Sequence, residues 1–133
     1  MGTVRKQRRA ETRTMLLEAG LKLVAEQGLE FASLDQVADA AGFTKGAIYR
    51  QFRSKPAFIL AIFEQFAAVA RAGSGARQAS WFIPLTIQFA SQALRDPLLR
   101  RRLAVVLAEA PDGTTPDGQI LRALARVFPA PAA

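Results

Sequence analysis

The chain has 133 residues, half of them hydrophobic, and its 18 basic and 11 acidic side chains give a formal net charge of +7. This length and composition allow one modest domain or two small units that share a core, and the charge favours nucleic acid or an anionic membrane surface as partner. Cys and His are both absent, which excludes disulfides, thiolate and His-dependent catalysis and the usual zinc and haem ligands. We therefore predict no enzyme, cofactor or metal site, although carboxylate, Lys or Tyr chemistry remains open.

The N-terminal segment, residues 1–13, carries five basic side chains and one acidic one. It is either a solvated, frayed terminus or a basic arm that follows a phosphate backbone. Glu18 and Lys22 interrupt the apolar residues that follow, so the segment does not have the pattern of a signal peptide. No apolar run approaches the ~18 residues of a membrane-spanning helix. We expect a soluble cytoplasmic protein without a membrane partner.

From Thr14 the apolar residues recur with the spacing of one helix face, namely Leu16, Ala19, Gly20, Leu23 and Val24. The pattern predicts a first helix that ends near Gln27. Gly28 then supplies the left-handed conformation that commonly follows a helix.

Residues 33–42, "SLDQVADAAG", predict a short second helix. Ser33 and Gln36 have the spacing of a capping box, and Asp35 opposes the helix dipole in the first turn. Gly42 ends this helix.

A third helix is predicted from Lys45 to about Phe52, with Thr44 as its cap. Ile48 and Phe52 are four residues apart and therefore point inward on the same face. The segment is basic, and no Asp or Glu occurs between Asp39 and Glu64. Two short helices joined by a glycine turn, the second of them basic, are typical of a helix-turn-helix, whose second helix enters the major groove of DNA.

The rest of the chain also has helical patterns. Ser54 caps a fourth helix with Pro56 in its first turn, and "RAGSGAR" breaks it after Arg71. Further helices are expected over 81–94, 97–110 and 119–128, with "PDGTTPDG" as a loop between the last two. No strand pattern occurs, so the fold class is all-α.

The sequence from "LEAGLKLVAEQG" through "AAGFTKGAIYRQF" to the "SK" that opens the fourth helix resembles the DNA-binding domain of the tetracycline-repressor (TetR) family of bacterial transcription regulators. The resemblance covers about residues 8–66, and departs from the family pattern at Arg53 and Pro56. A second stretch, 81–110, is less closely similar to the C-terminal domains of such regulators.

The resemblance implies a three-helix, helix-turn-helix DNA-binding domain at 1–53. A linking helix would join it to a helical domain for dimerisation and ligand binding at 54–133. Only about sixty residues follow Arg71, which is short for the family. Either the regulator is naturally reduced or the sequence lacks segments, with joins near "RAGSGAR" and "PDGTTPDG".

The resemblance also implies which residues contact DNA. Ser33, Thr44, Tyr49 and Lys55 would contact phosphates, and Lys45 and Arg50 would read bases, since both side chains pair well with guanine acceptors. Ala47 could meet a thymine methyl, Gly46 permits close backbone approach, and Gln36 either reaches a base edge or only completes its capping box. Tyr49 could instead brace the turn, and Lys45 and Arg50 could be ordinary solvated charges.

In the C-terminal part, Trp81, Phe82 and Phe89 are candidates for an inducer pocket, or else they fill the core or a dimer seam. The implied function is a homodimeric regulator that binds a palindromic operator in double-stranded DNA, as a repressor released by a small-molecule inducer. The alternatives are a constitutive DNA-binding protein without inducer, and a basic amphipathic binder of membrane surfaces. The sequence does not identify the operator, the regulated genes or the inducer, or distinguish repression from activation.

Overall fold

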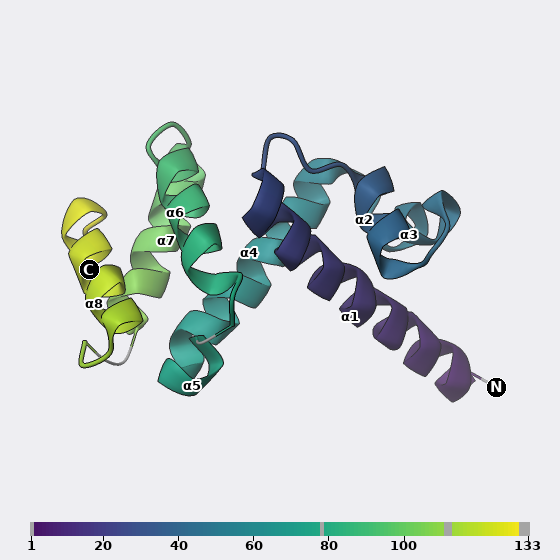
Figure 1. The fold of residues 1–133 in the computed structure, drawn as a ribbon, viewed down its shortest axis with the longest axis horizontal. Coiled ribbons are helices and arrows are strands. Elements are labelled where there is room, and N and C mark those ends of the chain that lie inside the picture. The colour runs from purple at the N-terminus through teal and green to yellow at the C-terminus, as the bar shows by residue number, and fades with distance from the viewer. Residues whose placement is uncertain (1, 78, 111–112, 131–133) are drawn as a thin grey trace. The chain divides into compact units, whose positions relative to one another are not determined.

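The computed structural model describes residues 2–77, 79–110 and 113–130, and all of its regular elements are helices (Figure 1). The predicted all-α class is therefore confirmed. The helices in chain order are α1 (Gly2–Gln27), α2 (Leu34–Ala41), α3 (Lys45–Gln51), α4 (Lys55–Ala72), α5 (Ser74–Arg77), α6 (Phe82–Ala93), α7 (Pro97–Glu109) and α8 (Pro116–Val127). None of the helices described here is long and apolar enough to cross a membrane.

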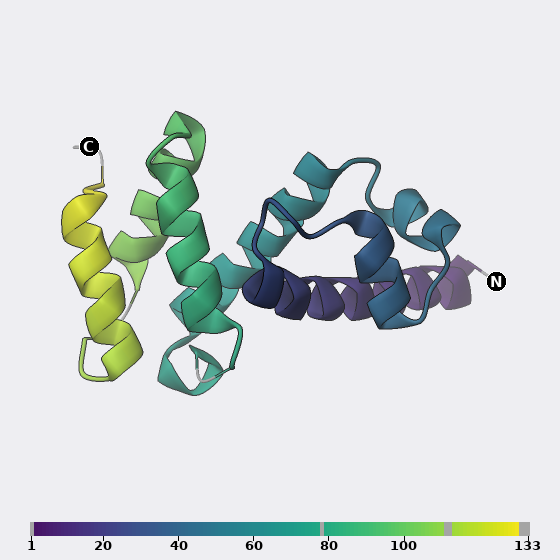
Figure 2. The same cartoon turned by 45° about the horizontal axis from the view of Figure 1, so that its top comes forward.

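The chain divides into two compact units, 1–62 and 63–133, and the division falls within α4. In the first unit α2 and α3 lie beside α1 (Figures 1 and 2). The core of this unit is built from the apolar stripe of α1, the inner faces of α2 and α3 and the start of α4. Its fully buried side chains include Leu16, Val24, Val37, Ile48 and Ile62.

The turn between α2 and α3 has the geometry that its glycine predicts. Gly42 has φ +79° and ψ +25°, a left-handed conformation that costs a glycine little. The N–H groups of Gly42 and Phe43 donate to the carbonyls of Asp39 and Ala38, at 3.1 and 2.9 Å. These bonds satisfy the last turn of α2 and fix the direction in which α3 leaves it.

The structure gives the boundaries of three predicted segments more closely. The first helix begins at Gly2, so the segment 2–13, expected to be either a frayed terminus or a basic arm, is helical. The fourth helix ends at Ala72, at the predicted "RAGSGAR" break, and the short helix α5 follows Gly73, which has φ +105°. The predicted loop before the last helix ends early, because the Thr115 hydroxyl accepts the Gly118 N–H at 3.2 Å and thereby starts α8 at Pro116.

The second unit is centred on aromatic side chains. The ring of Phe66 lies 5.3 Å from those of Phe82 and Phe89, and Phe63 meets Phe89 edge-on at 5.0 Å. Asp96 caps α7 as predicted, and its carboxylate accepts the N–H groups of Leu98 and Leu99 at 3.1 Å. The second unit therefore has a well-packed core of its own.

Candidate nucleic-acid interface

The capping box predicted at the start of α2 is formed. The Ser33 hydroxyl accepts the backbone N–H of Gln36 at 3.1 Å, and the Gln36 side-chain oxygen accepts the Ser33 N–H at 3.0 Å. This bond leaves the Gln36 amide NH₂ as the group with which it could contact a base. Both residues are exposed at the same helix end.

The short helix α3 is held by its buried side. Ile48 has no exposed surface and Phe52, just after the helix, is only 3 % exposed. At the other end the Thr44 hydroxyl accepts the Ala47 N–H at 3.2 Å. The helix is thus fixed at both ends by its sequence.

The predicted contact residues of α3 mostly share its outer face. Positions 45, 46, 49 and 50 lie within about 140° of the helix circumference, at about 100° per residue. Lys45, Gly46, Tyr49 and Arg50 are all exposed, whereas Ala47 is half-buried. Tyr49 keeps 47 % of its surface exposed, so it is available to solvent or a ligand.

The Arg50 side chain folds back along its own helix. Its Nε–H donates to the Gly46 carbonyl at 3.2 Å. One N–H of the guanidinium is thereby used, and the four that remain can still form the paired hydrogen bonds that suit guanine or phosphate.

An acidic side chain on α2 lies beside the basic helix, which sequence spacing did not indicate. The Asp35 carboxylate is 3.3 Å from the Lys45 ammonium, and these side chains are 44 % and 70 % exposed. An exposed pair contributes little to stability. It does place a negative charge next to a proposed base-reading residue.

We expect Asp35→Asn to strengthen DNA binding by up to about fivefold. The substitution would free Lys45 and remove a charge that phosphates repel, at the ~1 kcal/mol scale of exposed charge pairs. Binding titrations against a preferred duplex at two salt concentrations would measure the gain, which should shrink at higher salt. Asp39→Asn, an exposed carboxylate at the other end of α2, is the control, and equal gains from the two variants would contradict the specific pairing.

Lys55 at the start of α4 has a structural bond that the sequence did not predict. Its ammonium donates to the Glu30 carbonyl at 2.9 Å and so ties α4 to the connection between α1 and α2. Two further N–H groups of the ammonium remain for a phosphate.

We predict two separable losses in Lys55→Ala. Loss of the Glu30 bond should lower the free energy of unfolding by about 1 kcal/mol, measured by urea denaturation. Loss of a phosphate contact should weaken all duplexes alike and reduce the slope of log K against log salt by about one for each bound protomer. A sequence-selective loss of affinity would contradict the phosphate role.

The candidate pocket residues of the second unit are core side chains or border the core. Phe82 and Phe89 have no exposed surface and belong to the aromatic cluster, while Trp81 is half-buried beside Phe82. Their role in ligand binding stays a prediction.

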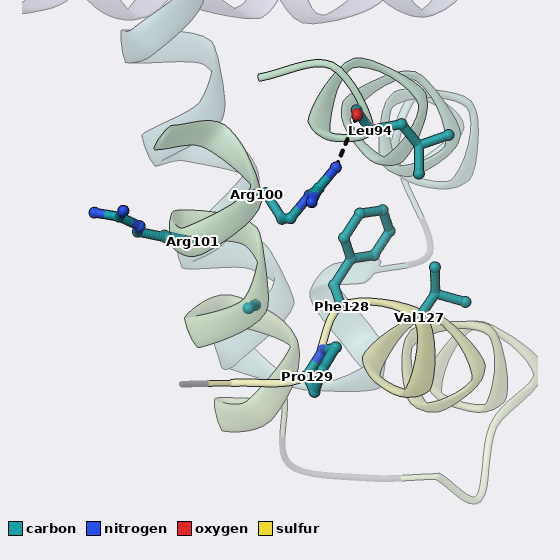
Figure 3. A pocket seen from close by; sticks show the side chains of 7 residues that line it. Leu94, Arg100, Arg101, Val127, Phe128 and Pro129 are labelled. Carbon is teal, nitrogen blue, oxygen red and sulfur yellow. Dashed lines mark hydrogen bonds between the residues drawn. The ribbon is translucent and has the colours of Figure 1, made fainter. Parts of the chain in front are cut away.

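A groove of about 490 Å³ lies elsewhere in the same unit, where α6, α7 and α8 meet (Figure 3). Its lining residues are Leu94, Arg100, Arg101, Ala104, Val127, Phe128 and Pro129. The Arg100 guanidinium donates to the carbonyls of Ala93 and Leu94 at 3.2 and 2.7 Å. Arg100 therefore caps the end of α6, whereas Arg101 points away from Phe128.

Comparison with known proteins places this geometry in a family. Residues 16–62 match the family model described as bacterial regulatory proteins, tetR family. These residues include α2, the glycine turn and α3. The helix-turn-helix unit of this chain is that of the TetR family.

Named helix-turn-helix transcriptional regulators are also similar to part of this chain. The transcriptional regulator AcrR of Shigella flexneri is 42 % identical over 59 residues, which cover 44 % of this chain and 27 % of AcrR. The activator FasR of Mycolicibacterium smegmatis is 37 % identical over 71 residues, 53 % of this chain and 32 % of FasR. The repressor KstR2 of Rhodococcus jostii is 39 % identical over 54 residues, 41 % of this chain and 26 % of KstR2.

The aligned part of this chain thus spans between a quarter and a third of these three relatives. No solved structure matches the chain. The family model therefore covers the helix-turn-helix unit and the start of α4.

Proposed function

We propose that this protein is a sequence-specific DNA-binding regulator of transcription that places α3 in the major groove. The observation that carries the proposal is the TetR-family match at residues 16–62, whose α3 has a buried anchor and an exposed basic face. A helix held in this way presents its outer side chains to base edges in a defined orientation.

In this proposal Lys45 and Arg50 read bases. Both are exposed on α3, and Arg50 keeps guanidinium donors for the O6 and N7 acceptors of guanine. Ala47 would meet a thymine methyl at the edge of the same face. Gln36 would contribute through its amide NH₂ only, because its oxygen is used in the capping box.

Phosphate contacts would fix the register of α3 on the duplex. We assign them to the Ser33, Thr44 and Tyr49 hydroxyls and to the Lys55 ammonium, with Gly46 allowing close approach. The Ser33 and Thr44 oxygens accept backbone bonds at helix starts, so their O–H groups stay free to donate outward.

We assign DNA binding to residues 1–53, and dimerisation with possible binding of a small-molecule inducer to residues 54–133. A homodimer would meet a palindromic operator, with half-sites set by its two-fold symmetry. The relatives include a named activator and a named repressor, so the repressor assignment rests on the wider resemblance. Such a regulator would act in the cytoplasm, where bacterial DNA lies.

Selection of tight-binding duplexes from a random pool, at about 0.15 M salt to suppress non-specific attraction, tests the proposal. We expect enrichment of a palindrome. Weak, salt-sensitive binding to every sequence would contradict sequence-specific regulation. A preferred single half-site without a palindrome would support DNA recognition but contradict the homodimer.

A further inference from the structure

The N-terminal half of α1 carries a one-sided basic surface. Arg5, Lys6, Arg9 and Arg13 are all exposed, and at about 100° per residue they fall within about 100° of the helix circumference. Glu11, the acidic residue of this segment, falls on the opposite side. A frayed terminus has no such sidedness, whereas the helix that begins at Gly2 gives it a fixed direction.

This basic face continues the buried face of the same helix. Leu16, Gly20 and Val24 lie at matching angles further along α1, where they are buried against the rest of the first unit. The basic residues therefore continue the side of α1 that packs against the other helices of the first unit.

Two contacts attach the segment to the end of α3. The Arg13 guanidinium lies over the Phe52 ring, 4.6 Å from its centroid, in cation–π geometry. The Gln51 side chain donates to the Arg9 carbonyl at 3.0 Å. These contacts join the basic part of α1 to α3. When α3 binds a duplex, the basic part of α1 is therefore brought to the same duplex.

We infer that Arg5, Lys6 and Arg9, here called the α1 stripe, bind phosphates of the duplex beyond the base pairs that α3 reads. Arg13 serves as the anchor of the stripe rather than as one of its contacts. The inference rests on the proposed function and adds a second, sequence-independent contact surface to it. The expected ligand is the sugar–phosphate backbone.

The chemistry of the stripe favours phosphate over a membrane. Arg and Lys side chains neutralise phosphates and release counterions, whereas a membrane-surface helix needs a broad apolar face beside its charges. Among residues 3–13 the large exposed apolar side chain is Val4 alone. The stripe is therefore suited to a polyanion in water.

The test uses the full chain and its preferred duplex in two lengths, one with long flanks and one cut to the selected site. In Arg5→Gln/Arg9→Gln the slope of log K against log salt should fall by about two for each bound protomer on the long duplex, with base preference unchanged. Shortening the flanks should weaken DNA binding by the wild type and leave binding by this variant almost unchanged. The variant has already lost its contacts with the phosphates that the short duplex lacks.

The control is Arg8→Gln/Lys22→Gln, which removes two exposed charges from other faces of α1. It should still lose affinity when the flanks are cut, and Arg5→Lys/Arg9→Lys should keep the wild-type slope. Equal sensitivity of wild type and stripe variant to flank length would overturn the inference. So would equal slope changes in the stripe and control variants, or a preference of the wild type for anionic vesicles over duplex.

Failure of the stripe is distinguishable from failure of the proposed function. If selection yields no preferred sequence, the regulator proposal fails, and the same slopes measured on a random duplex still report on the stripe. If a sequence is selected but flank length does not matter, the regulator proposal stands and the stripe fails.

Discussion

Replacing Arg50 by alanine is expected to lower discrimination at one base pair of the preferred site by about 1–3 kcal/mol. Arg50 is exposed on the outer face of α3, and its guanidinium donates to the Gly46 carbonyl of the same helix. Its removal should therefore leave Ile48 and Phe52 packed and the fold intact. Titration of the preferred duplex and of its single-base variants would locate the affected position.

Arg53→Ala is the matched control for Arg50→Ala. Arg53 is exposed and lies two residues after α3 ends, so its loss removes the same charge without touching the outer face of the helix. It should weaken all duplexes by a similar, small factor. Unchanged base preference in Arg50→Ala, or an equal change in Arg53→Ala, would contradict the base-reading role.

Replacing Gly20 by valine should lower the free energy of unfolding by about 3 kcal/mol, the upper part of the range for overpacked cores. A Cβ atom at Gly20 would overlap Phe58 Cζ and lie 3.2 Å from Ile62 Cδ1. The Phe58 ring is 2 % exposed and meets the Phe52 ring edge-on at 4.9 Å, so it has little room to move. Urea denaturation monitored by circular dichroism would measure the loss.

Gly46→Ala provides the contrast in the same unit. Gly46 is also helical, but a Cβ there meets its nearest neighbour, the Arg50 guanidinium, at 3.5 Å, which is ordinary contact. Replacing this helical glycine by alanine should then raise the free energy of unfolding by up to about 1 kcal/mol. Destabilisation of similar size at both positions would show that helix geometry, rather than the approach of α1 to α4, requires Gly20.

Local signals in the sequence predicted much of the helix-turn-helix. The capping box of Ser33 and Gln36, the end of α2 at Gly42 and the Thr44 cap each depend on neighbouring residues, and each occurs as predicted. The outward face of α3 followed from the same local period, because Ile48 and Phe52 fixed which side is buried.

Contacts between distant residues were not predictable in this way. The pairing of Asp35 with Lys45 depends on how α2 and α3 cross, and the bond from Lys55 to Glu30 joins residues 25 apart in the chain. The sequence left open whether residues 2–13 are ordered, because repulsion among their charges opposes helix formation. The stacking of Arg13 on Phe52 and the Gln51 bond support the helix there.

The shortness of α3 limits how much information one copy of it can extract from DNA. Its seven residues rise about 10 Å, and base pairs are about 3.4 Å apart, so roughly three of them face the helix. Three fully specified base pairs carry about six bits, whereas finding one site among ~10⁶ competitors takes about twenty. The missing bits, about fourteen, must come from elsewhere, such as a second half-site or the resistance of the DNA to bending. Each such source multiplies the preference for the correct site over its competitors.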